Sequence, residues 1–151
     1  VDQAAVAHQK TGSSVEILLR CQEKTHLNFG KVRFLGQRTD VPKLLNAMDM
    51  FFLPSLFEGF PIVAIEAQTA GLPLVIADTI SKEVELTNLV HWLPIDKGAE
   101  VWAEKYYQIA HTKVNRVQYA PIVERKGFDA RHSAQILQDI YVKNILRNEN
   151  S

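Results

Sequence analysis

Two glutamates with seven residues between them, Glu58 and Glu66, are the side chains whose types and spacing best suit chemistry. Glu66 shares one face of a predicted helix with Ile62 and Ala70, because residues at i, i+4 and i+8 point to the same side. A carboxylate on an apolar helix face is costly to bury unless something hydrogen-bonds it. Hydroxyl groups of a ligand would do so, and Glu58 lies in the loop just before this helix.

The start of the predicted helix offers a site for an anion. The amides of Ile62, Val63 and Ala64 lack partners within the helix and carry the positive end of its dipole. Gly59 lets the backbone approach a ligand closely. The site follows a predicted strand, and open α/β sheets bind ligands at the carboxyl ends of their strands. Phosphate on the amides and hydroxyls on Glu66 would suit a sugar nucleotide.

A strand, a helix and a second strand must position these residues. Residues 50–53 and 74–77 are short apolar runs, typical of strands that are buried on both faces. Pro61 is typical of a first helical residue and Gly71 of the residue after a helix, so residues 61–70 are predicted to form a helix of about three turns. Two parallel strands joined by a helix make the right-handed unit of α/β folds.

The rest of the chain continues this alternation. Asp40, Ser81 and Asp129 are typical residues for the start of a helix. Further strands are predicted over residues 15–19, 31–35 and 89–93, and helices over residues 2–10, 41–48, 81–86, 97–111, 119–127 and 130–147. The pattern predicts an α/β, Rossmann-like sandwich of three layers, with a parallel sheet covered on both faces.

Composition narrows the classes of protein to consider. The chain has 17 acidic and 17 basic residues, so no overall field favours nucleic acid. Its single cysteine, Cys21, cannot form an internal disulfide and suits a reducing compartment. No apolar run approaches the roughly 20 residues of a membrane span, and no signal peptide is recognised. The first residue is not methionine, so we expect a piece of a larger protein.

No metal site is predicted, and no cofactor. The five histidines show no ligand spacing and no carboxylate or cysteine companion. The chain also lacks an Asp-x-Asp pair that could hold a metal ion.

The segment PSLFEGFPIVAIEAQTAGLPLVIAD resembles the signature of family 4 glycosyltransferases of the GT-B fold, in which two glutamates have the spacing of Glu58 and Glu66. ADTISKEVELTNLV and GFDARHSAQILQDIY are similar to the capsular and exopolysaccharide branch of that family. The resemblance covers roughly residues 31–141. It implies that residues 1–151 are a nucleotide-sugar-binding domain, the C-terminal half of a GT-B fold, incomplete at its N-terminus.

The resemblance also implies roles for individual residues. Glu58 is implied to hold hydroxyls of the donor sugar and to stabilise charge at its anomeric carbon, which makes it the catalytic candidate. Glu66 is implied to bind the ribose. The remaining donor-binding candidates form two groups. The backbone around the helix start would meet the pyrophosphate or the sugar, and it comprises Gly59, Phe60, Pro61, Ile62 and Val63. A separate loop would contact the nucleobase, and it comprises Gly36, Gln37 and Arg38.

Each candidate has a plainer interpretation. Glu66 can be a helix carboxylate satisfied by a nearby amide or cation, and Glu58 a solvated loop acid or a charge that complements the helix dipole. Arg38 can be a solvated surface charge. Asp40 is better explained as a helix cap, and the charged turn at residues 82–83 as solvated.

The whole enzyme implied by the resemblance transfers a sugar, with retention, from a nucleotide diphosphate sugar, with a UDP-sugar as first choice, to a polysaccharide or glycolipid acceptor. Its partners are the donor and an N-terminal acceptor domain of the same full-length chain, absent here. No nucleic acid is expected, and the membrane is reached only through the missing part. The location implied is the cytoplasm, with the inner face of the membrane as an alternative. This chain alone is expected to be inactive.

The alternative function is a degenerate, non-catalytic binding module of the same fold. Residues 20–31 favour it, because this segment is short and lacks the glycine-rich turn that the family shows there.

Overall fold

The fold is known from a computed structural model, which describes residues 5–11, 14–20, 32–35, 38–110 and 112–149. Within these residues, one sheet has the strand order β3-β2-β1-β4-β5-β6. The strands are β1 (Ala5–Thr11), β2 (Ser14–Arg20), β3 (Val32–Phe34), β4 (Met50–Leu53), β5 (Leu74–Ala77) and β6 (Val90–Leu93). The helices are α1 (Val41–Ala47), α2 (Ile62–Thr69), α3 (Gly98–Ala110), α4 (Tyr119–Arg125) and α5 (Ala130–Glu149), with short 3₁₀ turns η1 (Lys82–Val84), η2 (Ile95–Lys97) and η3 (Arg116–Gln118).

The predicted parallel sheet is confirmed for the part that carries the site. β4, β5 and β6 pair in parallel, with Leu53 opposite Ile76 and Ile76 opposite Trp92. β2 and β3 are also parallel. β1 departs from the prediction, because it runs antiparallel to both of its neighbours, β2 and β4.

The prediction of a helix over residues 2–10 is wrong for the described residues 5–10, which belong to β1. β1 pairs with β2 along its whole length, from Ala5 opposite Arg20 to Thr11 opposite Ser14. Residues 12–13, between β1 and β2, lie outside the described residues. Pairing on both edges outweighs the local preference for a helix.

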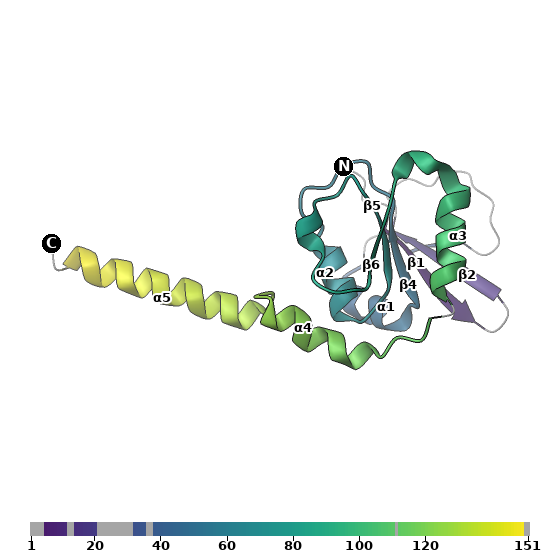
Figure 1. The fold of residues 1–151 in the computed structure, drawn as a ribbon. Helices are drawn as coiled ribbons and strands as arrows, with labels where there is room; N and C mark the ends of the chain where they lie inside the picture. The colour runs from purple at the N-terminus through teal and green to yellow at the C-terminus, as the bar shows by residue number, and fades with distance from the viewer. Residues whose placement is uncertain (1–4, 12–13, 21–31, 36–37, 111, 150–151) are drawn as a thin grey trace.

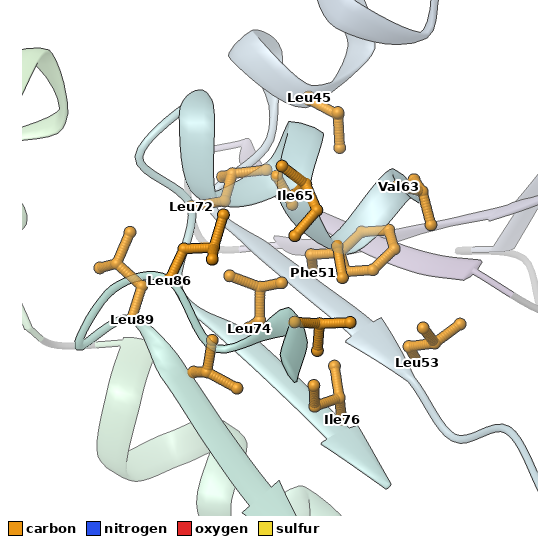
Figure 2. Packing of buried hydrophobic residues seen from close by; sticks show 14 of the residues in the cluster. Leu45, Phe51, Leu53, Val63, Ile65, Leu72, Leu74, Ile76, Leu86 and Leu89 are labelled. Carbon is orange, nitrogen blue, oxygen red and sulfur yellow. The ribbon is translucent and has the colours of Figure 1, made fainter. Parts of the chain in front are cut away.

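The two faces of the sheet bury separate apolar clusters, because successive strand residues point to opposite sides. On the α1–α2 side, Phe51 and Leu53 of β4 join Leu74 and Ile76 of β5, and Figure 2 shows these side chains gathered under α2. On the other side, Met50 and Val75 pack with Ile109 of α3. Figure 1 shows α3 and α2 on opposite sides of the sheet, which confirms the three layers.

A buried glutamine ties α2 to the chain that follows β5. Gln68 has no exposed surface. Its amide nitrogen donates to the carbonyls of Ala64 (3.0 Å) and Val84 (2.8 Å). Its oxygen accepts from the amides of Leu86 (3.0 Å) and Thr87 (2.9 Å), and from the Thr87 hydroxyl (3.0 Å). Every polar atom of this side chain is therefore satisfied by the residues that it holds in place.

The turn after α2 is closed by a glycine against an arginine. Gly71 has φ +69°, and a Cβ at this position would lie 2.6 Å from the Cα of Arg116. The Arg116 guanidinium donates to the carbonyls of Met48 and Asn46 at the end of α1. These contacts fix η3 against the beginning of β4.

α5 extends away from the sheet as a long arm in Figure 1, whereas α4 packs against α2 through the buried residues Tyr119 and Val123. The predicted cap is confirmed: Asp129 Oδ1 accepts from the amide of Arg131 (2.9 Å). The large apolar residues of α5 are exposed, among them Leu137, Ile140 and Tyr141. Among the described residues, no helix combines the length and the apolar character that a membrane crossing requires.

His91 of β6 should make stability depend on pH. Burial, and secondarily the charge of Lys105, lowers the pKa of His91 below its ordinary 6.5. The unfolded chain therefore binds more protons than the folded chain as the pH falls through that value. We expect the free energy of unfolding to be highest above about pH 7 and to decrease toward about pH 5, as measured by urea denaturation.

His91→Gln should remove this part of the pH dependence, whereas His132→Gln, in exposed α5, should leave it. An unchanged pH profile in His91→Gln would contradict the prediction.

Candidate functional site

The site begins where β4 ends and α2 starts. Pro54 follows the strand, and the chain turns through residues 55–60 before α2 (Ile62–Thr69) begins. The predicted helix over residues 61–70 is confirmed within one residue at each end, with Pro61 as the residue before the first turn rather than in it. The strand, the turn and the helix start thus form one continuous edge above β4.

The helix start exposes fewer amides than predicted. The amide of Ala64 donates to the carbonyl of Pro61 (2.9 Å), so it is not free for an anion. Within the described part of the chain, no acceptor is recorded for the amides of Ile62 and Val63. The Ile62 side chain is 68% exposed, so this end of α2 faces solvent and can be approached by a ligand.

An apolar groove of about 600 Å³ runs along α2. Glu66 is the one charged side chain among the described residues that line it, and it is only partly exposed. The walls come from α1, the β4–α2 loop, α2 and the start of α5: Pro42, Leu45, Asn46, Phe60, Ile62, Ile65, Thr69, Ala70, Phe128 and Ala130. The structure therefore brings Phe60, Ile62 and Glu66 together.

Glu58 lies deeper than the sequence suggested. It is 8% exposed and is not among the described residues that line the groove. Its Oε1 accepts a hydrogen bond from the Ser55 hydroxyl (3.0 Å). The interpretation of Glu58 as a solvated loop acid is therefore wrong, because its carboxylate is held by the protein.

Gly59 is open to its surroundings. A Cβ at this position would meet no atom within 4 Å, and its φ is not positive. Neither the backbone nor the packing of the described residues requires glycine here. A ligand that approaches the backbone closely is one reason for the absence of a side chain.

The loop implied to contact a nucleobase is only partly described, because Gly36 and Gln37 lie outside the described residues. Arg38 donates two hydrogen bonds to the Asp40 carboxylate (2.8 and 2.7 Å). Asp40 precedes α1, but its side chain makes no capping hydrogen bond, since Arg38 occupies it. The hydrogen bonds with Arg38 lower the pKa of Asp40, and those with Asp40 raise the pKa of Arg38.

A second cavity, of about 210 Å³, lies at the amino ends of β4 and β5. Its walls include Asp49 and Pro73, which precede β4 and β5, and also Arg116. Ligands of open α/β sheets bind beyond the carboxyl ends of the strands, and this cavity lies at their amino ends. It also contains none of the predicted site residues.

The remaining predictions concern charges and metals. Lys82 and Glu83 are exposed, as predicted for this turn. The Lys82 Nζ also lies 3.3 Å from the centre of the Trp92 ring, whose Nε1 donates to Glu85 (2.8 Å). Among the described residues, no group of three or more histidine, cysteine, aspartate or glutamate side chains is arranged to hold a metal ion. A site without metal stays a prediction. The 20–31 segment lies outside the described residues, apart from Arg20.

Sequence reasoning missed three residues around the site. Ser55 and Thr79 bond to the loop that carries Glu58, and the Phe128 ring stacks on that of Phe60 with 6.0 Å between centroids. A hydroxyl two residues after a buried strand was the available signal for Ser55 and Thr79. Phe128 lies 68 residues beyond Phe60 and gave no local signal.

Comparison with known proteins places this chain in a family. A family model described as glycosyl transferases group 1 matches residues 10–111. EpsF of Bacillus subtilis (strain 168), which carries the name of a glycosyltransferase, is 34% identical over 112 residues, or 73% of this chain and 29% of the relative.

Two further relatives share shorter segments. The Escherichia coli UDP-Gal:alpha-D-GlcNAc-diphosphoundecaprenol alpha-1,3-galactosyltransferase is 43% identical over 61 residues, 40% of this chain and 16% of the relative. The Campylobacter jejuni N,N'-diacetylbacillosaminyl-diphospho-undecaprenol alpha-1,3-N-acetylgalactosaminyltransferase is 43% identical over 58 residues, 38% of this chain and 15% of the relative.

The chain spans less than a third of the length of each of these three relatives. No significant match was found among solved structures. The family match includes β4, α2, β5 and β6, and therefore the whole of the groove except its α5 end. The chain belongs to the group 1 glycosyltransferases, the family that its two glutamates and their helix resemble.

Proposed function

We propose that the chain is the donor-binding half of a glycosyltransferase that moves a sugar from a UDP-sugar to a glycolipid or polysaccharide acceptor, with retention. One observation carries this proposal: an apolar groove along α2 in which Glu66 is the one charged side chain among the described lining residues. A nucleoside needs apolar walls for its base and an acceptor for its ribose hydroxyls, and a groove of this kind offers both.

The names of two relatives support the choice of substrates. The name of the Escherichia coli enzyme includes UDP-Gal. The names of the Escherichia coli and the Campylobacter jejuni enzymes both include a sugar on diphosphoundecaprenol. We therefore propose a UDP-sugar as donor and a sugar carried on a lipid diphosphate as acceptor, at the cytoplasmic face of the membrane.

In the proposed complex, Glu66 accepts hydrogen bonds from the ribose hydroxyls, and the amides of Ile62 and Val63 face the diphosphate. Glu66 lies four positions after Ile62, a rise of about 6 Å along the helix axis, which keeps the phosphates away from the carboxylate. Glu58 binds hydroxyls of the sugar and stabilises charge at its anomeric carbon. The nucleobase meets the loop of Gly36, Gln37 and Arg38.

The acceptor is proposed to bind on an N-terminal domain of the full-length chain. Transfer requires donor and acceptor to be held together with water excluded. Binding of the donor is therefore the property to test in this chain.

Calorimetric titration with UDP and GDP tests the proposal. The unsubstituted chain should bind UDP more tightly than GDP, and Glu66→Gln should weaken UDP binding about 10- to 30-fold, because the ribose hydroxyls lose a charged acceptor. The matched control is Glu104→Gln, an exposed glutamate of α3, which should change the affinity less than about twofold.

Two results would contradict the proposal in different ways. Equal UDP affinity in Glu66→Gln and the unsubstituted chain would remove Glu66 from the site. No binding of either nucleotide would favour the alternative, a non-catalytic module that keeps the fold without the donor site.

A further inference from the structure

A chain of hydrogen bonds links the ends of two strands to Glu58. The Thr79 hydroxyl, after β5, donates to the Ser55 carbonyl (2.9 Å). The Ser55 hydroxyl, after β4, donates to Glu58 Oε1 (3.0 Å). β4 and β5 are parallel neighbours, so their carboxyl ends lie at the same edge of the sheet. The sheet therefore fixes the positions of Thr79 and Ser55, where this series of hydrogen bonds starts.

Glu58, the acceptor at the end of this series of hydrogen bonds, has little contact with water. Glu58 is 8% exposed, whereas Ser55 is partly buried and Thr79 is exposed. A glutamate side chain has three rotatable bonds, and a donor held by the backbone restricts how its carboxylate is oriented. Because Thr79 holds the Ser55 backbone, the position of the Ser55 hydroxyl is set from the ends of two strands rather than from one loop alone.

The single proton of the Ser55 hydroxyl has two acceptors in reach. One is Glu58 Oε1 at 3.0 Å, and the other is the Phe57 carbonyl at 3.2 Å. A carboxylate is the stronger acceptor, and it is also the closer one. The proton therefore goes mainly to Glu58.

We propose that Ser55 is a positioning residue for Glu58, and that Thr79 supports it. Ser55 orients the carboxylate toward the sugar of the bound donor, so it determines how strongly the site prefers a nucleotide that carries a sugar over the nucleotide alone. This inference rests on the proposed function, in which Glu58 binds the sugar and Glu66 the ribose.

The test compares binding of UDP with binding of UDP-glucose, UDP-galactose and UDP-N-acetylglucosamine by the 151-residue chain. In Ser55→Ala, the UDP-sugar that the unsubstituted chain binds most tightly should lose about tenfold in affinity, while UDP itself should change less than about twofold. Ser55→Thr keeps the hydroxyl and should restore the preference. Ser133→Ala, an exposed serine in α5, is the matched control and should bind as the unsubstituted chain does.

A second measurement needs no ligand. Three-bond couplings should show the same χ1 rotamer populations for Glu58 in the unsubstituted chain and in Ser55→Thr, and shifted populations in Ser55→Ala. If Ser55→Ala does not fold, Thr79→Val removes the support from an exposed position and should cause a smaller change of the same kind.

The outcomes separate this inference from the proposed function. Failure of the unsubstituted chain to bind any nucleotide overturns the proposed function, and the Glu58 couplings then decide the role of Ser55. If the unsubstituted chain prefers a UDP-sugar over UDP, an equal preference in Ser55→Ala overturns the role of Ser55 alone. So does an equal loss of UDP and UDP-sugar affinity, because that is the result of a merely structural change.

Discussion

Gln68→Leu should lower the free energy of unfolding by about 3–5 kcal/mol, which is a large part of the roughly 5–15 kcal/mol typical of a domain. Leucine fills a similar volume but neither donates nor accepts. The amides of Leu86 and Thr87 would lose their acceptor, and the carbonyl of Val84 would lose its donor. These groups are buried, so each costs about 1–3 kcal/mol when left without a partner. Urea denaturation measures the change.

The matched control for this substitution is Gln135→Leu. Gln135 is exposed in α5 and donates only along its own helix, to Asp139 (3.0 Å). Its replacement should change the free energy of unfolding by less than about 0.5 kcal/mol. Similar stability of the two variants would show that the Gln68 hydrogen bonds do not hold α2 to the following chain.

Gly71→Ala should cost about 3–5 kcal/mol of stability, for two reasons that act together. The residue has φ +69°, a conformation that alanine rarely adopts, and its new Cβ would lie 2.6 Å from the Cα and 2.8 Å from the carbonyl oxygen of Arg116. Backbone atoms cannot rotate away as a side chain can. The backbone of Arg116 is also held by its guanidinium, which bonds to carbonyls at the end of α1.

Two other glycines separate these causes. Gly127 has φ +92°, and a Cβ added there would meet no atom within 4 Å, so Gly127→Ala should cost only about 1–2 kcal/mol. Gly59 has neither a positive φ nor a close neighbour, so Gly59→Ala should change stability by less than about 0.5 kcal/mol. Equal losses in Gly71→Ala and Gly127→Ala would contradict the proposed contact with Arg116.

The unit that carries the site could be predicted from local sequence. The short apolar runs of β4 and β5 are typical of buried strands, and Pro61 and Gly71 mark both ends of α2 to within one residue. Glu58 and Glu66 are therefore in the loop and the helix in which the sequence predicted them. The burial of the two glutamates could not be predicted in this way, because burial depends on segments that are distant in sequence.

The features that were missed depend on such distant partners. The sequence of β1 was interpreted as a helix because its strand character comes from pairing with β2 and β4. Gln68 is a polar residue with apolar neighbours, which signals a satisfied buried group but not that its acceptors and donors lie 16 to 19 residues away.

A similar limit applies to single charges. Asp40 has the position of a helix cap, but a charged neighbour two residues earlier changes its role. Local pattern identified the residue as important to this turn and named the wrong partner, because a side-chain oxygen can accept from more than one donor.

The most direct measurement is a crystal structure of this chain with a UDP-sugar bound. We expect the ribose hydroxyls to lie within hydrogen-bond distance of the Glu66 carboxylate, the diphosphate to face the amides of Ile62 and Val63, and the sugar to contact Glu58. A nucleotide bound in the cavity beside Asp49 and Arg116, with the groove along α2 empty, would contradict this assignment of the donor site.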